Sequence, residues 1–117
     1  MDMPRRLDDP PQHPALSDVS LLTLLGALAD RTRLAVVEQL LADGEHVCGT
    51  FDVDVSHSTL SHHLKLLREA GIIRQWESGR NRMTALREVE LNEHFPGLLD
   101  SIMSRYTKEG KQPHGLN

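Results

Sequence analysis

The chain has 117 residues, of which 38% are hydrophobic and only 3% aromatic, which is enough for one small domain with an aliphatic core. No apolar run approaches the roughly 20 residues that span a bilayer, and the first residues lack the apolar stretch of a secretory signal. The single cysteine, Cys48, excludes an intrachain disulfide framework. We therefore expect a cytoplasmic protein without a membrane segment.

The charge of the chain is unevenly distributed. The net charge is −4, yet residues 57–87 contain six Lys and Arg residues against two acids, a local charge of +4. A basic segment in an acidic chain concentrates attraction for phosphate on one surface. This pattern favours nucleic-acid binding, and its alternative is a solvated basic face.

The first half of the chain predicts a flexible arm and two helices. Residues 1–15 contain four prolines and few apolar groups, which indicates an arm without stable structure. Ser17 or Asp18 can cap a helix that runs to about residue 29. Asp30 can cap a second helix over residues 31–42, which Gly44 ends. Its predicted inward residues are Leu34, Val37, Leu40 and Leu41.

The segment SHSTLSHHLKLLREAGII, residues 56–73, predicts a helix with two different faces. A short helix near residues 47–53 and a turn are expected to precede it, Ser56 can cap it and Gly71 can end it. Apolar residues recur at the spacing of a buried stripe, at Leu60, Leu64 and Leu67. The opposite arc is small, polar and basic, with no carboxylate before Glu69. A helix that inserts into the major groove of DNA needs these groups for base edges and phosphates.

The second half of the chain predicts a hairpin followed by helices. The sequence IIRQWESGRNRMTALR indicates two strands joined at residues 78–81, where Gly79 and Asn81 can adopt positive φ. A helical turn over residues 88–94 and a last helix, with Pro96 in its first turn, follow. The resulting fold class is mainly α with a small β-hairpin, a winged helix-turn-helix. We expect one domain over residues 16–106, between the arm and a flexible tail at 107–117.

The DNA contacts are predicted to come from the polar arc and from the hairpin, or wing. Arg80 and Arg82 lie near the tip of the wing and can meet phosphates or the minor groove. Trp76, in the first strand, is expected to pack against the base of the wing. The predicted DNA-binding residues are His57, Ser58, Thr59, Ser61, His62, Lys65, Arg68, Arg80 and Arg82.

With these elements in place, the chain resembles the ArsR/SmtB family of bacterial transcriptional repressors. Three segments carry the resemblance: LLGALADRTRLAVVEQLL (24–41), STLSHHLKLLREAGII (58–73) and the ESGR hairpin that follows. The resemblance implies a repressor that binds a pseudo-palindromic double-stranded operator as a homodimer and is released by an unidentified small inducer. It also implies pairing through the first and last helices. Two-fold pairing would place two recognition helices about one DNA turn, ~34 Å, apart. The predicted dimer residues are Leu21, Leu22, Leu25, Leu98, Leu99, Ile102 and Met103.

The sequence does not contain the metal ligands that many relatives use. Where those proteins carry a Cys-x-Cys pair, this chain has His46-Val47-Cys48, and a tetrahedral zinc site needs about four ligands. Near the last helix it offers only Glu93, His94 and Asp100, with His114 in the tail. His62 and His63 point about 100° apart on the helix, so His62 is expected to face the groove. His63 is expected to face the core, where backbone groups would hydrogen-bond its ring nitrogens. We therefore expect no metal and no cofactor.

Cys48 is the remaining candidate for sensing. A thiolate beside His46 would be more nucleophilic and could serve as a redox sensor. The alternative is that Cys48 is a small buried hydrophobic residue.

Other function classes are less well supported by the sequence. The chain contains no glycine-rich phosphate loop, no GxSxG and no HExxH, so we expect no enzymatic activity. A winged helix that binds protein and lacks DNA affinity is the second hypothesis, against which the basic arc and the arginine wing argue.

Overall fold

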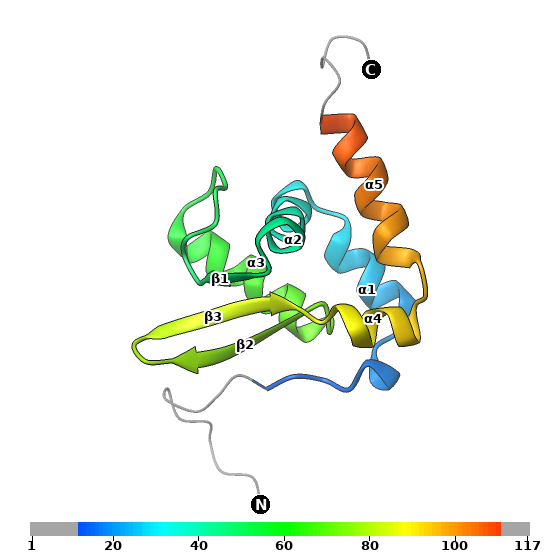
Figure 1. Ribbon diagram of the computed structural model, residues 1–117, viewed down its shortest axis with the longest axis horizontal. Coiled ribbons are helices and arrows are strands. Elements are labelled where there is room, and N and C mark those ends of the chain that lie inside the picture. The colour runs from blue at the N-terminus through cyan, green and yellow to red at the C-terminus, as the bar shows by residue number, and fades with distance from the viewer. Residues whose placement is uncertain (1–11, 111–117) are drawn as a thin grey trace, which may run out of the picture.

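The computed structural model, which describes residues 12–110, packs helices around a small antiparallel sheet (Figure 1). The first half of the fold is helical, the recognition helix predicted at 56–73 lies in the middle, and a hairpin and two further helices follow. In chain order the elements are η1 (Leu16–Asp18), α1 (Leu21–Leu28), α2 (Arg31–Asp43), β1 (Glu45–Val47), α3 (His57–Glu69), β2 (Ile73–Ser78), β3 (Asn81–Leu86), α4 (Glu88–His94) and α5 (Leu98–Gly110).

Side-chain caps set the first residues of three helices. Asp30 accepts a hydrogen bond from the backbone N–H of Arg33, and Ser56 accepts one from that of Thr59, so both predicted caps are confirmed. The prediction for α1 was wrong: Ser20 caps it at Leu21, and Ser17 and Asp18 instead belong to η1. The short 3₁₀ turn separates from α1 because Leu16 turns inward and is buried.

The predicted short helix at residues 47–53 is not formed. The chain instead enters β1, which pairs with β3, and the Cys48 N–H extends this pairing by donating to the Arg82 carbonyl at 2.7 Å. The following segment is irregular and buries Phe51. The Gln39 side chain bonds both the N–H and the carbonyl of Asp52 at 2.8 Å, which satisfies backbone groups that a helix would otherwise pair.

The three strands are ordered β1-β3-β2, so β2 is an edge strand. The predicted hairpin is confirmed, with Ser78 opposite Asn81 and a two-residue turn between them. Gly79 has a φ of 62°, as the first central residue of a type II′ turn requires. Asn81 was also expected to be able to adopt a positive φ, but it is the first residue of β3. Within residues 12–110, only glycines have a positive φ.

The core lies between α2, α3 and the sheet. The predicted apolar stripe of α3 is buried, since Leu60 and Leu64 are 4% exposed and Leu67 is 0% exposed. The buried face of α2 is formed by Val36, Val37 and Leu40. Of its other predicted inward residues, Leu34 is half-buried and packs against the core, whereas the prediction for Leu41 was wrong, since it is 38% exposed. The face is displaced because α2 packs against α3, β3 and α5 together.

Both ends of the predicted domain differ from the expected limits. Helix α5 continues to Gly110, past residue 106, and Pro96 precedes it in a turn with Gly97 at a φ of 77°. Residues 12–15 were expected to belong to a flexible arm, but His13 and Pro14 are hydrogen-bonded to the rest of the chain. The remainder of the predicted arm and tail, residues 1–11 and 111–117, lies outside the described residues. Within 12–110, no helix is long and apolar enough to cross a membrane.

Candidate nucleic-acid interface

The polar arc of α3 faces solvent as a continuous surface. We call these six residues, all exposed, the recognition arc: His57, Ser58, Thr59, Ser61, His62 and Lys65. The buried leucines on the opposite face hold the helix against the core, so the arc is presented by a firmly packed element. Its hydroxyl, imidazole and ammonium groups supply the donors and acceptors that base edges and phosphates bind.

His63 separates from its neighbour His62 as predicted, although its partner is different. The two rings are 6.2 Å apart at their centroids, and the His63 side chain is only 13% exposed. An Arg33 guanidinium nitrogen lies 3.0 Å from His63 Nδ1, where a backbone partner was expected. Arg33 also donates from Nε to the Ala27 carbonyl at 2.6 Å. This arginine therefore ties α3 to the junction of α1 and α2.

Asp30 completes the same junction. Its carboxylate lies 3.8 Å from His63 Nδ1 and caps α2. Burial opposes ionisation of Asp30, but the backbone hydrogen bond and the charge of Arg33, together with His63, outweigh it and lower the pKa of the carboxyl. Asp30 therefore stays ionised beside the base of the recognition helix.

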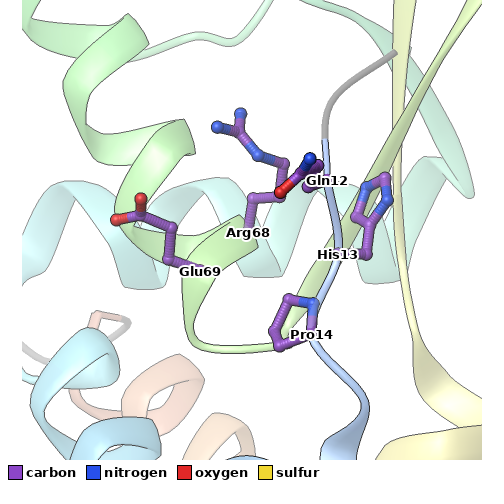
Figure 2. A pocket seen from close by; sticks show the side chains of 5 residues that line it. All are labelled: Gln12, His13, Pro14, Arg68 and Glu69. Atoms are coloured by element: carbon purple, nitrogen blue, oxygen red, sulfur yellow. The ribbon is translucent and has the colours of Figure 1, made fainter. Parts of the chain in front are cut away.

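Arg68 does not share the exposure of the recognition arc. It is half-buried in the last turn of α3, and its Nη1 donates to Gln75 Oε1 on β2 at 2.7 Å. With Gln12, His13 and Pro14, its side chain lines a hollow of about 420 Å³ (Figure 2). The sequence predicted a DNA contact for Arg68, whereas the structure places it between the recognition helix and the wing.

The charged residues of the wing differ in their surroundings. Arg80 is exposed in the turn, whereas Arg82 lies one residue into β3 and forms an ion pair with Glu77 at 2.7 Å. Arg74, which the sequence analysis did not single out, is exposed on β2 with its guanidinium carbon 4.4 Å from the centre of the Trp76 ring. Arg74 and Trp76 are two residues apart on one strand and therefore share a face; this spacing was the signal available, and it is weak.

Comparison with known proteins places this geometry in a family. Residues 28–75 match the model of a helix-turn-helix domain. The chain is 33% identical over 79 residues to YceK of Bacillus subtilis (strain 168), an uncharacterized HTH-type transcriptional regulator, covering 65% of this chain and 79% of that protein. The chain belongs to the HTH-type transcriptional regulators.

Solved structures of regulators have the same fold. A possible transcriptional regulator for arsenical resistance superposes with a TM-score of 0.57 at 28% identity, over 79% of this chain and 100% of that one. An ArsR-like transcriptional regulator from Rhodococcus sp. RHA1 gives 0.58 at 22% identity, over 76% and 84% of the two chains. An ArsR family transcriptional regulator gives 0.56 at 24% identity, over 80% and 93%. Together with the sequence matches, these structures identify the chain as an ArsR-like winged helix-turn-helix regulator.

In this ArsR-like regulator, Cys48 is part of a hydrogen-bonded cluster. The thiol is half-buried, with Sγ 3.0 Å from Thr84 Oγ1 and 3.1 Å from Gln75 Nε2. The Cys48 thiol therefore contacts polar side chains of β2 and β3, whereas a small buried hydrophobic residue would have only apolar neighbours.

His46 is directed to other partners. Its Nε2 lies 2.8 Å from Asp43 Oδ2, its Nδ1 lies 3.3 Å from Thr50 Oγ1, and its ring stacks on Phe51 with centroids 4.5 Å apart. A group of three or more His, Cys, Asp or Glu side chains placed to hold a metal is not found among residues 12–110.

Proposed function

We propose that this ArsR-like regulator binds double-stranded DNA in a sequence-specific way, with α3 as the helix that reads bases in the major groove. The observation that carries this proposal is the recognition arc: six polar or basic side chains are exposed on one face of a helix whose other face is buried. Hydroxyl and imidazole groups at the N-terminal end of such a helix can reach base edges. Lys65, further along, suits a phosphate contact.

The wing supports a second contact beside the helix. Figure 1 shows the β2–β3 hairpin extending from the body, with its turn far from α1 and α5. Arg80 in that turn is available for a phosphate, and the Arg82 guanidinium can exchange its ion pair with Glu77 for one. The alternative, a winged helix that binds protein and lacks DNA affinity, has no comparable observation in its favour, because the recognition arc and the wing both expose basic side chains.

A homodimer through the first and last helices is part of the proposal. Leu21, Leu22 and Leu25 on α1 are 50%, 80% and 37% exposed, an apolar surface that a second copy would cover. On α5, Leu98 and Ile102 are half-buried and can join this seam. The predicted dimer residues Leu99 and Met103 lie in the chain's own core, at 7% and 4% exposure, so we leave them out of the seam.

We further infer that binding represses transcription and that an unidentified small inducer releases the protein. This inference rests on the family resemblance and on the position of both helices of the seam at the end of the molecule opposite the hairpin (Figure 1). A change in the dimer seam would alter the separation of the two recognition helices and thereby weaken a palindromic contact. The inferred operator is a pseudo-palindrome in the promoter region of the protein's own gene.

The test of DNA binding compares two duplexes. Fluorescence anisotropy would measure the affinity for the promoter duplex and for a scrambled duplex of equal composition, between 50 and 300 mM salt. We expect tighter binding to the promoter and a linear fall of log K with log salt, with a slope of about −0.9 for each phosphate contacted. Absence of duplex affinity at low salt would contradict the proposal and favour a protein-binding module.

The test of the dimer uses Leu22→Asp in sedimentation velocity. A charge in the seam should convert the dimer to a monomer and lower operator affinity, because a single recognition helix makes too few base contacts. Val89→Asp is the matched control, since Val89 is 72% exposed on α4, outside the proposed seam. A wild-type monomer, or equal effects of both variants, would contradict the assignment.

A further inference from the structure

Gln75 is a buried amide at the joint between the recognition helix and the wing. It is only 5% exposed on β2, and its side-chain oxygen accepts from Arg68 of α3 at 2.7 Å. Its Nε2 donates to Cys48 Sγ at 3.1 Å and is 3.4 Å from Thr84 Oγ1. A buried amide without partners would be costly, so these contacts account for a polar residue in this part of the core.

The contacts around Gln75 set the orientation of its amide. Cys48 and Thr84 on one side accept from the nitrogen, which leaves Oε1 directed toward Arg68. The opposite orientation would place two donors against each other at the Arg68 contact, because a guanidinium can only donate. Thr84, which is fully buried, lies directly opposite Gln75 in the register of β2 and β3. Residues of both wing strands therefore hold Gln75 Oε1 where it accepts from Arg68.

The segment before η1 closes the outer side of this joint. His13 Nε2 accepts the backbone N–H of Gln75 at 2.9 Å along the free edge of β2, and the Pro14 carbonyl accepts from Arg87 at 2.8 Å. Figure 2 shows Gln12, His13 and Pro14 opposite Arg68 across the hollow. Partial shielding from water strengthens a charge-assisted hydrogen bond such as that between Arg68 and Gln75.

We propose that Arg68 and Gln75 are a positioning pair that fixes the angle between the recognition helix and the wing. The proposal rests on the proposed DNA-binding function, because that angle sets the distance between the bases that α3 reads and the phosphates that the wing meets. Arg68 acts here through Gln75 and makes no phosphate contact. The pair thereby contributes to operator selectivity without touching DNA.

The decisive comparison is between Arg68→Met and Lys65→Met, two substitutions that each remove one cation from α3. For Lys65→Met, we expect weaker binding to promoter and scrambled duplexes alike and a salt slope reduced by about one. For Arg68→Met, we expect about tenfold weaker promoter binding, with the scrambled affinity and the salt slope unchanged. A slope reduced by about one in Arg68→Met, or unchanged selectivity, would overturn the proposal.

A double variant separates positioning from stability. Arg68→Met and Gln75→Leu each remove one side of the hydrogen bond between the two residues and should lower the melting temperature, whereas the double variant removes both sides and should recover much of the loss. We expect selectivity to stay low in the double variant although its stability returns. Recovery of selectivity together with stability would show a purely structural role and overturn the proposal.

A measurement without DNA keeps the two proposals distinguishable. Hydrogen exchange of β2 and β3 amides in the free protein should be faster in Arg68→Met than in the wild type and unchanged in Lys65→Met. If wild-type protein does not prefer the promoter duplex, the proposed function fails, and this exchange difference still tests the tie between helix and wing. Equal exchange in all three proteins would overturn the pair itself.

Discussion

The recognition helix and the wing present their DNA-facing groups in different ways. In α3 the recognition arc is exposed on one face, and the residues that hold the helix in place occupy another face. In the wing, cations that could meet phosphate also interact within the hairpin: Arg82 pairs with Glu77, and Arg74 stacks on Trp76. In a helix with 3.6 residues per turn, the side chains that contact DNA and those that pack against the core lie on different faces. In a two-stranded hairpin with one covered face, the same exposed side chains both hold the hairpin together and are available to DNA.

The largest expected effect comes from the joint that connects the two regions. Gly71 has a φ of 77°, and a Cβ there would lie 2.2 Å from Leu16 Cδ2. Gly71→Ala should therefore destabilise the fold by about 2–4 kcal/mol, from backbone strain and overpacking together. Chemical denaturation would measure this loss. Gly26→Ala, at a helical glycine with open space around it, is the control and should stabilise the fold slightly, by up to about 1 kcal/mol.

The second prediction concerns the recognition arc. Ser61→Ala or His62→Ala should weaken promoter binding by about 1–3 kcal/mol while leaving the scrambled duplex almost unaffected, because base contacts carry the sequence information. Anisotropy titrations with both duplexes would show the difference, and Asn92→Ala, exposed on α4 outside the proposed seam, serves as the control. Equal losses on the two duplexes would remove base reading from this helix.

The third prediction concerns the ion pair between Arg82 and Glu77 in the wing. Arg80→Ala should reduce the salt slope by about one, because Arg80 is exposed in the turn. Arg82→Ala should have a smaller effect, since phosphate binding by Arg82 requires loss of its ion pair with Glu77. Glu77→Gln should then strengthen binding to both duplexes. Weaker binding of Glu77→Gln would show that the ion pair holds the wing in its DNA-binding shape.

The smallest expected effect is a pH dependence at the edge of the wing. Partial burial of the His13 ring, followed by the charges of Arg87, Arg68 and Arg74, lowers the pKa of His13, with Glu90 opposing. A neutral ring accepts the Gln75 N–H, so this contact is fully present above the ordinary histidine pKa of about 6.5 and is lost as pH falls through the lower folded value.

The Gln75 amide resonance, followed by NMR between pH 8 and pH 4.5, reports this transition. In the wild type it should shift with a midpoint below 6.5, as the proton on His13 displaces the N–H bond. In His13→Gln, whose side-chain oxygen can accept without titrating, the shift should disappear. A midpoint above 6.5 in the wild type would contradict the expected direction.

Much of the fold follows from local patterns in the sequence. The stripe of Leu60, Leu64 and Leu67 and the cap at Ser56 predicted α3 and its exposed arc, because helical periodicity and capping depend on nearby residues. Gly79 between two β-rich runs predicted the hairpin for the same reason. The family resemblance rested on these same segments and is confirmed.

Tertiary structure decided the features that depend on distant partners. Residues 45–47 became a strand because β3, almost forty residues later, offers them a free edge, so no helix formed at 47–53. Arg68 donates a hydrogen bond to the buried side chain of Gln75, on another element, a contact that the periodicity of α3 did not predict. The side of a helix on which an arginine lies follows from the sequence, but the group that it reaches is set by packing between elements, which local periodicity does not contain.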